Sequence, residues 1–166
     1  MLKELKWGIL FSGALLLWLC IERAVGLHDE YIEYHRYFTN LFIVVAVLIY
    51  ILALRDKRQS MANQEMSWAQ GFLSGFLIAV VVAVLSPLLQ IIAHYLITPH
   101  FFDNMIEMVV TNGTMSVEAA NEYFSLQSYI IQSVIGALLL GTLTSAVVAF
   151  FMRTTFHDTK RKRHRT

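Results

Sequence analysis

The stretch that decides the fold is residues 68–97, WAQGFLSGFLIAVVVAVLSPLLQIIAHYLI. It is predominantly apolar throughout, and a helix of this length that rises about 1.5 Å per residue extends roughly 45 Å. The hydrocarbon core of a membrane is about 30 Å thick, so such a helix must tilt, bend or protrude. Pro87 provides a cause for a bend, because proline removes a backbone donor and clashes with the preceding turn. We therefore expect residues 88–97 to form a distinct outer segment.

Three further apolar stretches lie at residues 7–27, 38–54 and 128–152. A helix crosses the hydrocarbon core with roughly 20 mainly apolar residues, whereas strands of a membrane barrel alternate over about ten. Of all residues, 57% are apolar and 15% are charged, against about 45–50% and about 25% in soluble domains. The sequence thus predicts an all-α fold, an integral membrane four-helix bundle that forms one domain over residues 1–166. A disordered chain and an ordinary soluble enzyme are excluded.

The first apolar stretch also has features of a signal peptide, because Lys3 and Lys6 precede it and a weak cleavage site lies at residues 24–26. Glu22 and Arg23 are unfavourable directly before such a site, so we expect this helix to be retained. The single cysteine excludes a disulfide framework and a cysteine-rich metal site.

Basic residues predict the orientation, because the cytoplasmic loops of membrane proteins are rich in Lys and Arg. Most of them lie before the first helix, between the second and third, or after the fourth: Lys3, Lys6, Arg55, Lys57, Arg58, Arg153, Lys160, Arg161, Lys162, Arg163 and Arg165. Only Arg23 and Arg36 lie on the other side. We therefore expect both termini in the cytoplasm and the loops 28–37 and 98–127 outside. The basic tail, residues 153–166, is expected to contact anionic lipid head groups.

The outer loop 98–127 has a helical pattern of its own. Apolar residues at 101, 102, 105, 106, 108 and 109 follow three- and four-residue spacing, which indicates an amphipathic helix. Asn112-Gly113 ends it, and Ser116 is a suitable N-cap for a second short helix over residues 117–124. These helices are expected to form an extracytoplasmic lid packed on the bundle between the third and fourth long helices. The alternative is a helix that lies in the outer membrane interface.

Small residues recur every fourth position on the third and fourth long helices. Those that we expect at a helix–helix contact are Gly71, Gly75, Ala79, Ala137, Gly141 and Ser145. Because lipid tails are as apolar as leucine, membrane helices associate where small residues let their backbones approach. We predict a tight antiparallel hairpin of the two helices along these stripes. The alternative is that one stripe mediates homodimerisation.

Polar residues within the apolar stretches gather towards the outer side and are candidates for function. Those that we expect to form a polar pocket opening outwards are Glu22, Asn40, Gln90, His94 and Gln132. The inner halves of the helices are nearly free of strongly polar groups. The alternative is a structural role, in which Glu22 pairs with Arg23, Arg36 or His94 and holds the helices in one arrangement.

A second candidate group lies in the first outer loop and consists of His28, Asp29, Glu30 and His35. Imidazole and carboxylate groups can bind a divalent metal, but no spacing here matches a known metal motif. We therefore predict no metal and no cofactor, and a solvated loop in which Asp29 caps a helix. The sequence also has no nucleophile elbow, P-loop, dinucleotide fingerprint or HExxH motif, so no catalytic residue is assigned and an enzyme is disfavoured.

Several short motifs occur together along the chain: VGLHDE at residues 25–30, YFTNLF at 37–42, QGF at 70–72, SG at 74–75, LSP at 85–87, ITP at 97–99 and FF at 101–102. With them the chain resembles a family of small four-helix bacterial membrane proteins, seen mainly in Bacteroidota, whose function is unknown. The resemblance covers nearly the whole chain. It implies a bacterial inner-membrane location, but it implies no activity and no catalytic residues.

The function that these features favour is non-enzymatic: a multi-pass membrane protein that acts as a scaffold or accessory subunit. The alternative is a binding or transport module for a small ligand or an ion that uses the outward-facing polar pocket. The expected partners are the lipid bilayer and either a second copy of the chain or another membrane protein, but no nucleic acid.

Overall fold

The computed structural model describes residues 2–154, which form helices, turns and loops without any strand. Four helical segments are long enough and apolar enough to cross a membrane: Leu2–Ala24, Ile32–Gln59, Trp68–Ile97 and Leu126–Met152. The all-helical class and the four membrane-length segments predicted from the sequence are therefore confirmed. This combination indicates a membrane protein. The predicted lipid-binding residues 160–165 of the tail lie outside the described residues.

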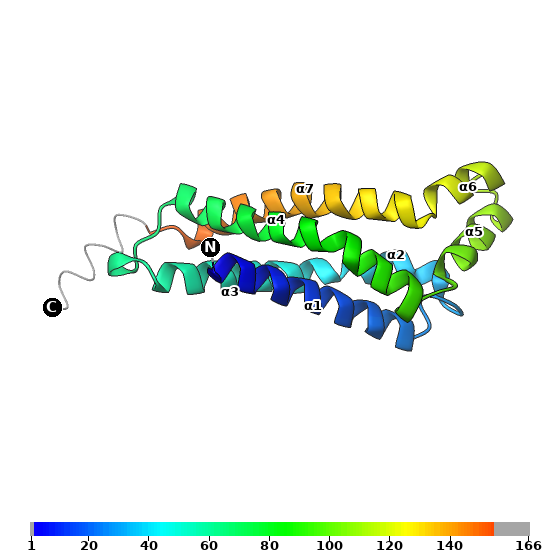
Figure 1. The fold of residues 1–166 in the computed structure, drawn as a ribbon, viewed down its shortest axis with the longest axis horizontal. Coiled ribbons are helices and arrows are strands. Elements are labelled where there is room, and N and C mark those ends of the chain that lie inside the picture. The colour runs from blue at the N-terminus through cyan, green and yellow to red at the C-terminus, as the bar shows by residue number, and fades with distance from the viewer. Residues whose placement is uncertain (1, 155–166) are drawn as a thin grey trace.

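The elements follow in the order α1 (Leu2–Ala24), η1 (Ile32–Tyr34), α2 (His35–Asn40), α3 (Phe42–Gln59), η2 (Ala62–Gln64), α4 (Trp68–Ile92), η3 (Ala93–Ile97), α5 (Phe101–Thr111), α6 (Val117–Tyr123) and α7 (Leu126–Met152). Figure 1 shows the four long helices running side by side, with α5 and α6 at the end opposite the N-terminus. Helix α4 contacts both α7 and α1, and α3 contacts the same two helices. The long connection between α4 and α7 therefore spans one end of the molecule.

The first two apolar segments differ in detail from their predicted bounds. Helix α1 begins at Leu2 rather than at residue 7. Its charged first turn is held in place because Lys3 pairs with Asp56 and Glu4 pairs with Lys57, both on α3. The second segment is not one continuous α-helix, since α2 ends at Asn40 and α3 starts at Phe42.

The third segment continues as an α-helix through Pro87 and changes only at Ala93, where the π-helix η3 begins. Proline at position 87 cannot donate to the carbonyl of Ala83, but the hydroxyl of Ser86 donates to that carbonyl at 2.8 Å. A side-chain donor thus replaces the missing backbone donor, as is common in membrane helices. The predicted distinct outer segment, residues 88–97, is therefore only five residues long, Ala93–Ile97. The helix axis bends in its C-terminal half (Figure 1).

The contact between α4 and α7 is close at the small residues of both helices. A Cβ atom added to Gly75 would lie 2.2 Å from the hydroxyl oxygen of Ser145, and one added to Gly71 would lie 3.1 Å from the Cβ atom of Ala149. On α7, a Cβ atom added to Gly141 would lie 2.5 Å from the Cβ atom of Ala79. At these points the two backbones approach so closely that only small side chains fit.

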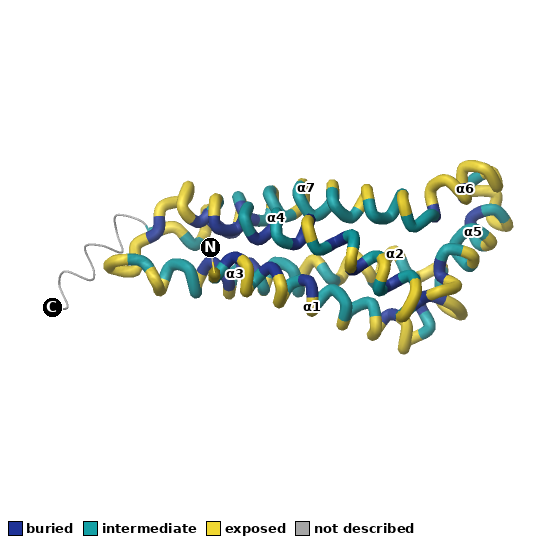
Figure 2. The backbone as a smooth tube through the Cα atoms, viewed as in Figure 1, coloured by how far each residue is buried: buried dark blue, intermediate teal, exposed yellow. Residues whose placement is uncertain are grey.

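The apolar core lies between the long helices and not around the whole molecule. Its buried members include Tyr50, Leu54, Met66, Ile78 and Val148. Figure 2 shows buried positions along the inward sides of α4 and α3 and exposed positions along the outward sides. Many of the exposed side chains are large and apolar, as contact with lipid tails requires.

The end of the molecule that holds the N-terminus contains a polar cluster, built largely from charged residues outside the apolar stretches 7–27 and 38–54. The carboxylate of Glu4 accepts hydrogen bonds from Lys57 Nζ at 2.7 Å and from the Ser74 hydroxyl at 2.8 Å. Asp56 accepts a hydrogen bond from Trp7 Nε1 at 2.9 Å. These bonds connect α1 to α3 and α4. Sequence analysis missed them because it considered the basic residues only as markers of orientation.

Candidate functional site

Among the described residues, the most strongly buried charged group at the end of the bundle near α5 is Glu22, whose exposed fraction is 0%. It lies in the last turn of α1. Its Oε1 atom accepts hydrogen bonds from Trp18 Nε1 at 2.8 Å and from the Thr39 hydroxyl at 2.6 Å. A buried carboxylate is tolerated only where such partners replace water. These two donors fix the orientation of the carboxylate and leave Oε2 available to other groups.

Two histidines approach that second oxygen. His28 Nε2 lies 3.4 Å and His35 Nδ1 lies 4.0 Å from Glu22 Oε2. The centroids of the two imidazole rings are 5.0 Å apart. The ligand atoms of Glu22, His28 and His35 all lie within 4.8 Å of one another. We refer to these three residues as the Glu-His-His cluster.

The turn after α1 brings His28 back over the end of its own helix. Gly26 adopts a positive φ of 82°, which is favourable for glycine, and its carbonyl accepts from the backbone nitrogens of Asp29 and Tyr31. The backbone carbonyl of His28 in turn accepts a hydrogen bond from Asn104 Nδ2 at 2.8 Å. His35 starts α2, and Thr39 follows it by four residues, so both face Glu22.

Helix α5 provides an aromatic wall for the cluster. The ring of Phe101 lies 5.1 Å from that of His28 and 4.9 Å from that of His35, measured between centroids. Phe101 is buried, and the neighbouring Phe102 stacks on His94 at 5.0 Å. Helix α5 therefore packs directly on the imidazole groups.

A cavity of about 240 Å³ lies beside the cluster. Its lining is mainly apolar and aromatic, with a few polar groups, which is the usual character of a small-molecule site. The lining residues are Leu15, Trp18, Leu19, His28, His35, Thr39, Phe42, Gln90, Ala93, His94, Thr98, Phe101, Phe102 and Tyr129. The cavity thus draws on all four membrane-length segments and on α5.

Two imidazole nitrogens at this cavity are buried without a hydrogen-bond partner among residues 2–154. They are Nδ1 of His28 and Nδ1 of His94. Buried polar atoms in folded proteins are nearly always paired, so each such atom needs an explanation. Both histidines line the same cavity, so a polar occupant of the cavity could supply the missing partner.

The structure brings together some of the predicted site residues and separates others. Glu22 meets His28 and His35 from the predicted loop cluster, while Gln90 and His94 line the cavity. Asn40 is exposed and does not line it. Gln132 is also exposed and donates to the Ser128 hydroxyl at 2.8 Å.

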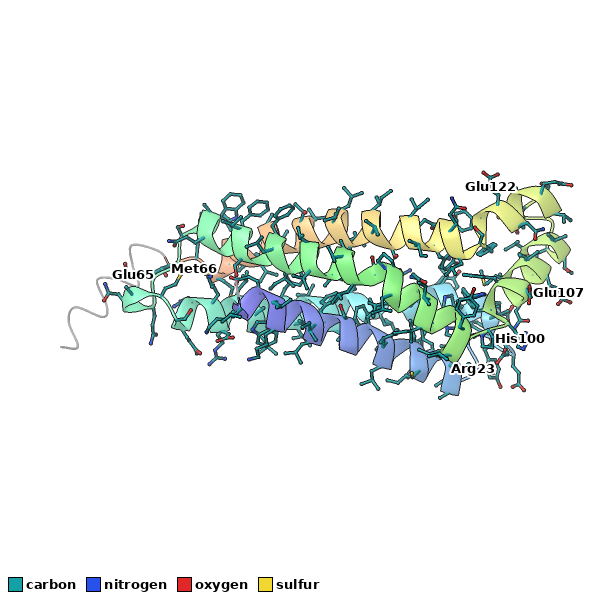
Figure 3. All side chains as sticks on the ribbon, viewed as in Figure 1. Arg23, Glu65, Met66, His100, Glu107 and Glu122 are labelled. Carbon is teal, nitrogen blue, oxygen red and sulfur yellow. The ribbon has the colours of Figure 1, made fainter. Side chains whose placement is uncertain are left out.

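The other loop residues have contacts outside the cluster. Asp29 pairs with Arg23 and accepts a hydrogen bond from Asn104, rather than capping a helix. Arg23 is thus engaged with Asp29, and Arg36 donates to the Tyr37 hydroxyl. Within the described residues, neither arginine is the partner of Glu22 that the sequence analysis considered. Glu30 is exposed. Figure 3 shows Arg23 and His100 at the same end of the molecule as Glu107 and Glu122.

Sequence analysis missed Trp18, Thr39 and Phe101 as parts of the site. Trp18 and Glu22 are four residues apart, which places them on one helix face, so this spacing was a signal. Thr39 also carried a signal, because it is a polar residue within an apolar stretch, directly before Asn40. Phe101 carried none as a site residue, because it reaches the site only through the packing of α5.

Four membrane-length helices and a buried Glu-His-His cluster beside an aromatic cavity define a small helical membrane protein with a polar site at one end. Residues 6–154 match the family described as "Protein of unknown function (DUF4199)", so the chain belongs to this family. The resemblance to a family of unknown function is thereby confirmed. No curated protein and no solved structure matches the chain.

Proposed function

We propose that this protein is a multi-pass membrane protein that binds a small polar ligand or ion in the outer cavity. The observation that carries this proposal is a pair of buried imidazole nitrogens, of His28 and His94, that have no partner within residues 2–154 and belong to residues lining one largely apolar cavity. An apolar pocket with few polar groups selects its ligand by the placement of those groups. Gln90 adds an amide to the same wall.

Binding is favoured over transport by the position of Glu22. Its carboxylate is fully buried behind Trp18, Thr39 and His28, and Glu22 is not among the residues that line the cavity. A path across the membrane through Glu22 would require these contacts to open. The proposed role is therefore a binding module in which Glu22 supports the histidines.

In this proposal α5 and α6 form a lid over the outer end of the bundle. Phe101 and Phe102 of α5 line the cavity, and Asn104 holds the turn that carries His28. The other face of the two helices carries the exposed acidic residues Asp103, Glu107, Glu118 and Glu122. Such a face disfavours the alternative of a helix attracted to anionic lipid.

The proposed location is the bacterial inner membrane, with both termini in the cytoplasm and the lid outside. The asymmetry of basic residues supports this orientation. A scaffold or accessory role, with a second copy or another membrane protein as partner, remains a prediction. The exposed apolar side chains of the long helices do not favour it, because lipid contact alone requires them.

Cysteine accessibility tests the proposed binding role. In a Cys20→Ser background, Ala93→Cys places a thiol at the cavity wall, and Ala79→Cys places one on the same segment at the contact with α7. We expect a small, membrane-impermeant methanethiosulfonate to modify Ala93→Cys in right-side-out vesicles and to leave Ala79→Cys unmodified. If both variants react only after denaturation, the cavity is closed to the outside and the proposed role is wrong.

A further inference from the structure

We propose that the Glu-His-His cluster binds a divalent transition-metal ion of the Zn²⁺ type, with Glu22, His28 and His35 as its protein ligands. The inference deepens the proposed function and rests on it, because the metal would bind beside the proposed cavity and share His28 and His35 with its lining. Two imidazoles and one carboxylate form a ligand set that suits Zn²⁺ and other first-row transition metals. Mg²⁺ and Ca²⁺ prefer ligand sets made only of oxygen.

The contact of His28 with Glu22 has the length of a long hydrogen bond, whereas the contact of His35 is longer, so hydrogen bonds close only part of the cluster. His35 Nδ1 lies 4.0 Å from Glu22 Oε2, which is too long for a hydrogen bond. His28 Nε2 lies 3.4 Å from the same oxygen. Two ligands of a tetrahedral Zn²⁺ are roughly 3.4 Å apart when each bond is about 2.1 Å. Small ring rotations of His35 would therefore complete the set.

The surroundings of Glu22 support a metal ligand rather than a simple ion pair. Trp18 and Thr39 both bind Oε1, so the carboxylate presents Oε2 to the two imidazoles. Hydrogen bonds of this kind orient ligands at metal sites and are part of their design. Phe101 covers both rings, and an apolar shell controls the access of solvent to a metal.

A second observation concerns the other nitrogen of His28, which would remain free for a polar occupant of the cavity while Nε2 binds the metal. The side chain of His28 is 3% exposed, yet its Nδ1 atom has no partner within the described residues. An imidazole buried without a full set of partners is costly in a structural role alone. The two histidine ligands also line the cavity, so a further ligand of the metal could enter from there.

The three ligands come from separate segments, namely the end of α1, the following turn and the start of α2. They meet only in the folded chain, so metal binding must stabilise the fold by mass action. Thermal unfolding is therefore a second readout beside metal content. It applies to the unmodified protein and needs no variant.

The test uses full-length protein in mild detergent, without a polyhistidine tag and stripped with a chelator. Equilibrium dialysis against Zn²⁺ should load about one ion per chain and raise the unfolding temperature, whereas Mg²⁺ should do neither. Co²⁺ should give the visible absorption of a tetrahedral site with nitrogen and oxygen ligands. Glu22→Gln and His35→Ala should reduce Zn²⁺ affinity at least about tenfold.

His100→Ala is the matched control, because His100 is an exposed imidazole near the same end of the molecule and outside the cluster. It should bind Zn²⁺ as the wild type does. The unfolding temperature of each metal-free variant shows whether it is folded, and the wild-type comparison of Zn²⁺ with Mg²⁺ holds even if a variant does not fold. No uptake by the wild type, or equal uptake by the two cluster variants, would overturn the metal site.

The two proposals can fail separately. If Ala93→Cys is labelled but the protein binds no Zn²⁺, the proposed cavity role stands and the metal site is wrong. If the protein binds Zn²⁺ but Ala93→Cys is protected from labelling, the metal site is a closed structural centre and the cavity role is wrong.

Discussion

At the scale of single residues, the hydroxyl of Thr39 stabilises a buried charge, since it donates a hydrogen bond to Glu22 Oε1 at 2.6 Å. Thr39→Val keeps the shape of the side chain and removes the donor. A hydrogen bond to a buried charged group contributes about 1.5–3 kcal/mol. We expect thermal unfolding in detergent to show a loss of about this size.

Thr142→Val is the control for this variant. The Thr142 hydroxyl donates to the carbonyl of Leu138 in its own helix, which already has a backbone partner in a regular helix. Its loss should change stability little. Equal effects of the two substitutions would show that Thr39 does not support Glu22.

The sequence identified the three residues of the cluster as candidates, but it did not predict that they lie close together. Glu22 stood out because a carboxylate in an apolar stretch is rare, and His28 and His35 stood out as possible ligands. They were assigned to two separate groups, because the spacing of six or seven residues across a loop fixes no geometry. The missing information was the positive φ of Gly26, which turns His28 back towards Glu22.

At the scale of elements, Ser86 explains why α4 continues through Pro87. Ser86→Ala should cost about 1 kcal/mol, because the carbonyl of Ala83 then lacks its side-chain donor. In a Pro87→Ala background the restored backbone N–H can bind that carbonyl. The cost of Ser86→Ala should therefore be clearly smaller there, as a double-mutant cycle on thermal unfolding would measure. Equal costs in both backgrounds would contradict this account.

The contact between α4 and α7 gives a second prediction at this scale. Gly75→Leu should destabilise the protein by at least about 1–3 kcal/mol, because even a Cβ atom there would overlap Ser145. Gly136→Leu is the matched control on α7, where a Cβ atom has no neighbour within 4 Å in the described part of the chain. Thermal unfolding in detergent should separate the two. Full stability of Gly75→Leu would contradict the close pairing.

These two elements differ in how far the sequence predicts them. Small residues with a period of four are readable, because helical geometry puts them on one face. The effect of Pro87 on the helix could not be predicted in this way, because it depends on whether the hydroxyl of Ser86 donates to the carbonyl of Ala83. The break at Ala93 follows instead from the start of η3, where both the amide and the hydroxyl of Thr98 bind the Ala93 carbonyl.

At the scale of the whole molecule, the two ends have different chemistry. One end holds the cluster of Lys3, Glu4, Asp56 and Lys57, and the other holds the Glu-His-His cluster under α5. Each cluster ties the first apolar segment to the second one, and α4 and α7 add the apolar contact between them. The polar groups thus fix the ends of the helices, where the hydrocarbon core gives way to the polar interface and water is nearest.

The orientation is testable with three exposed positions that Figure 3 labels, Glu65 near one end and Glu107 and Glu122 near the other. In a Cys20→Ser background, each is replaced singly by cysteine. Because basic residues gather at the end that holds Glu65, we expect a membrane-impermeant maleimide to label Glu107→Cys and Glu122→Cys in right-side-out vesicles. Glu65→Cys should react only after the vesicles are permeabilised. Both outer positions lie between the third and fourth membrane-length segments, so they should behave alike. Labelling of one without the other would overturn the number of crossings. Exchange of the two patterns would overturn only their direction.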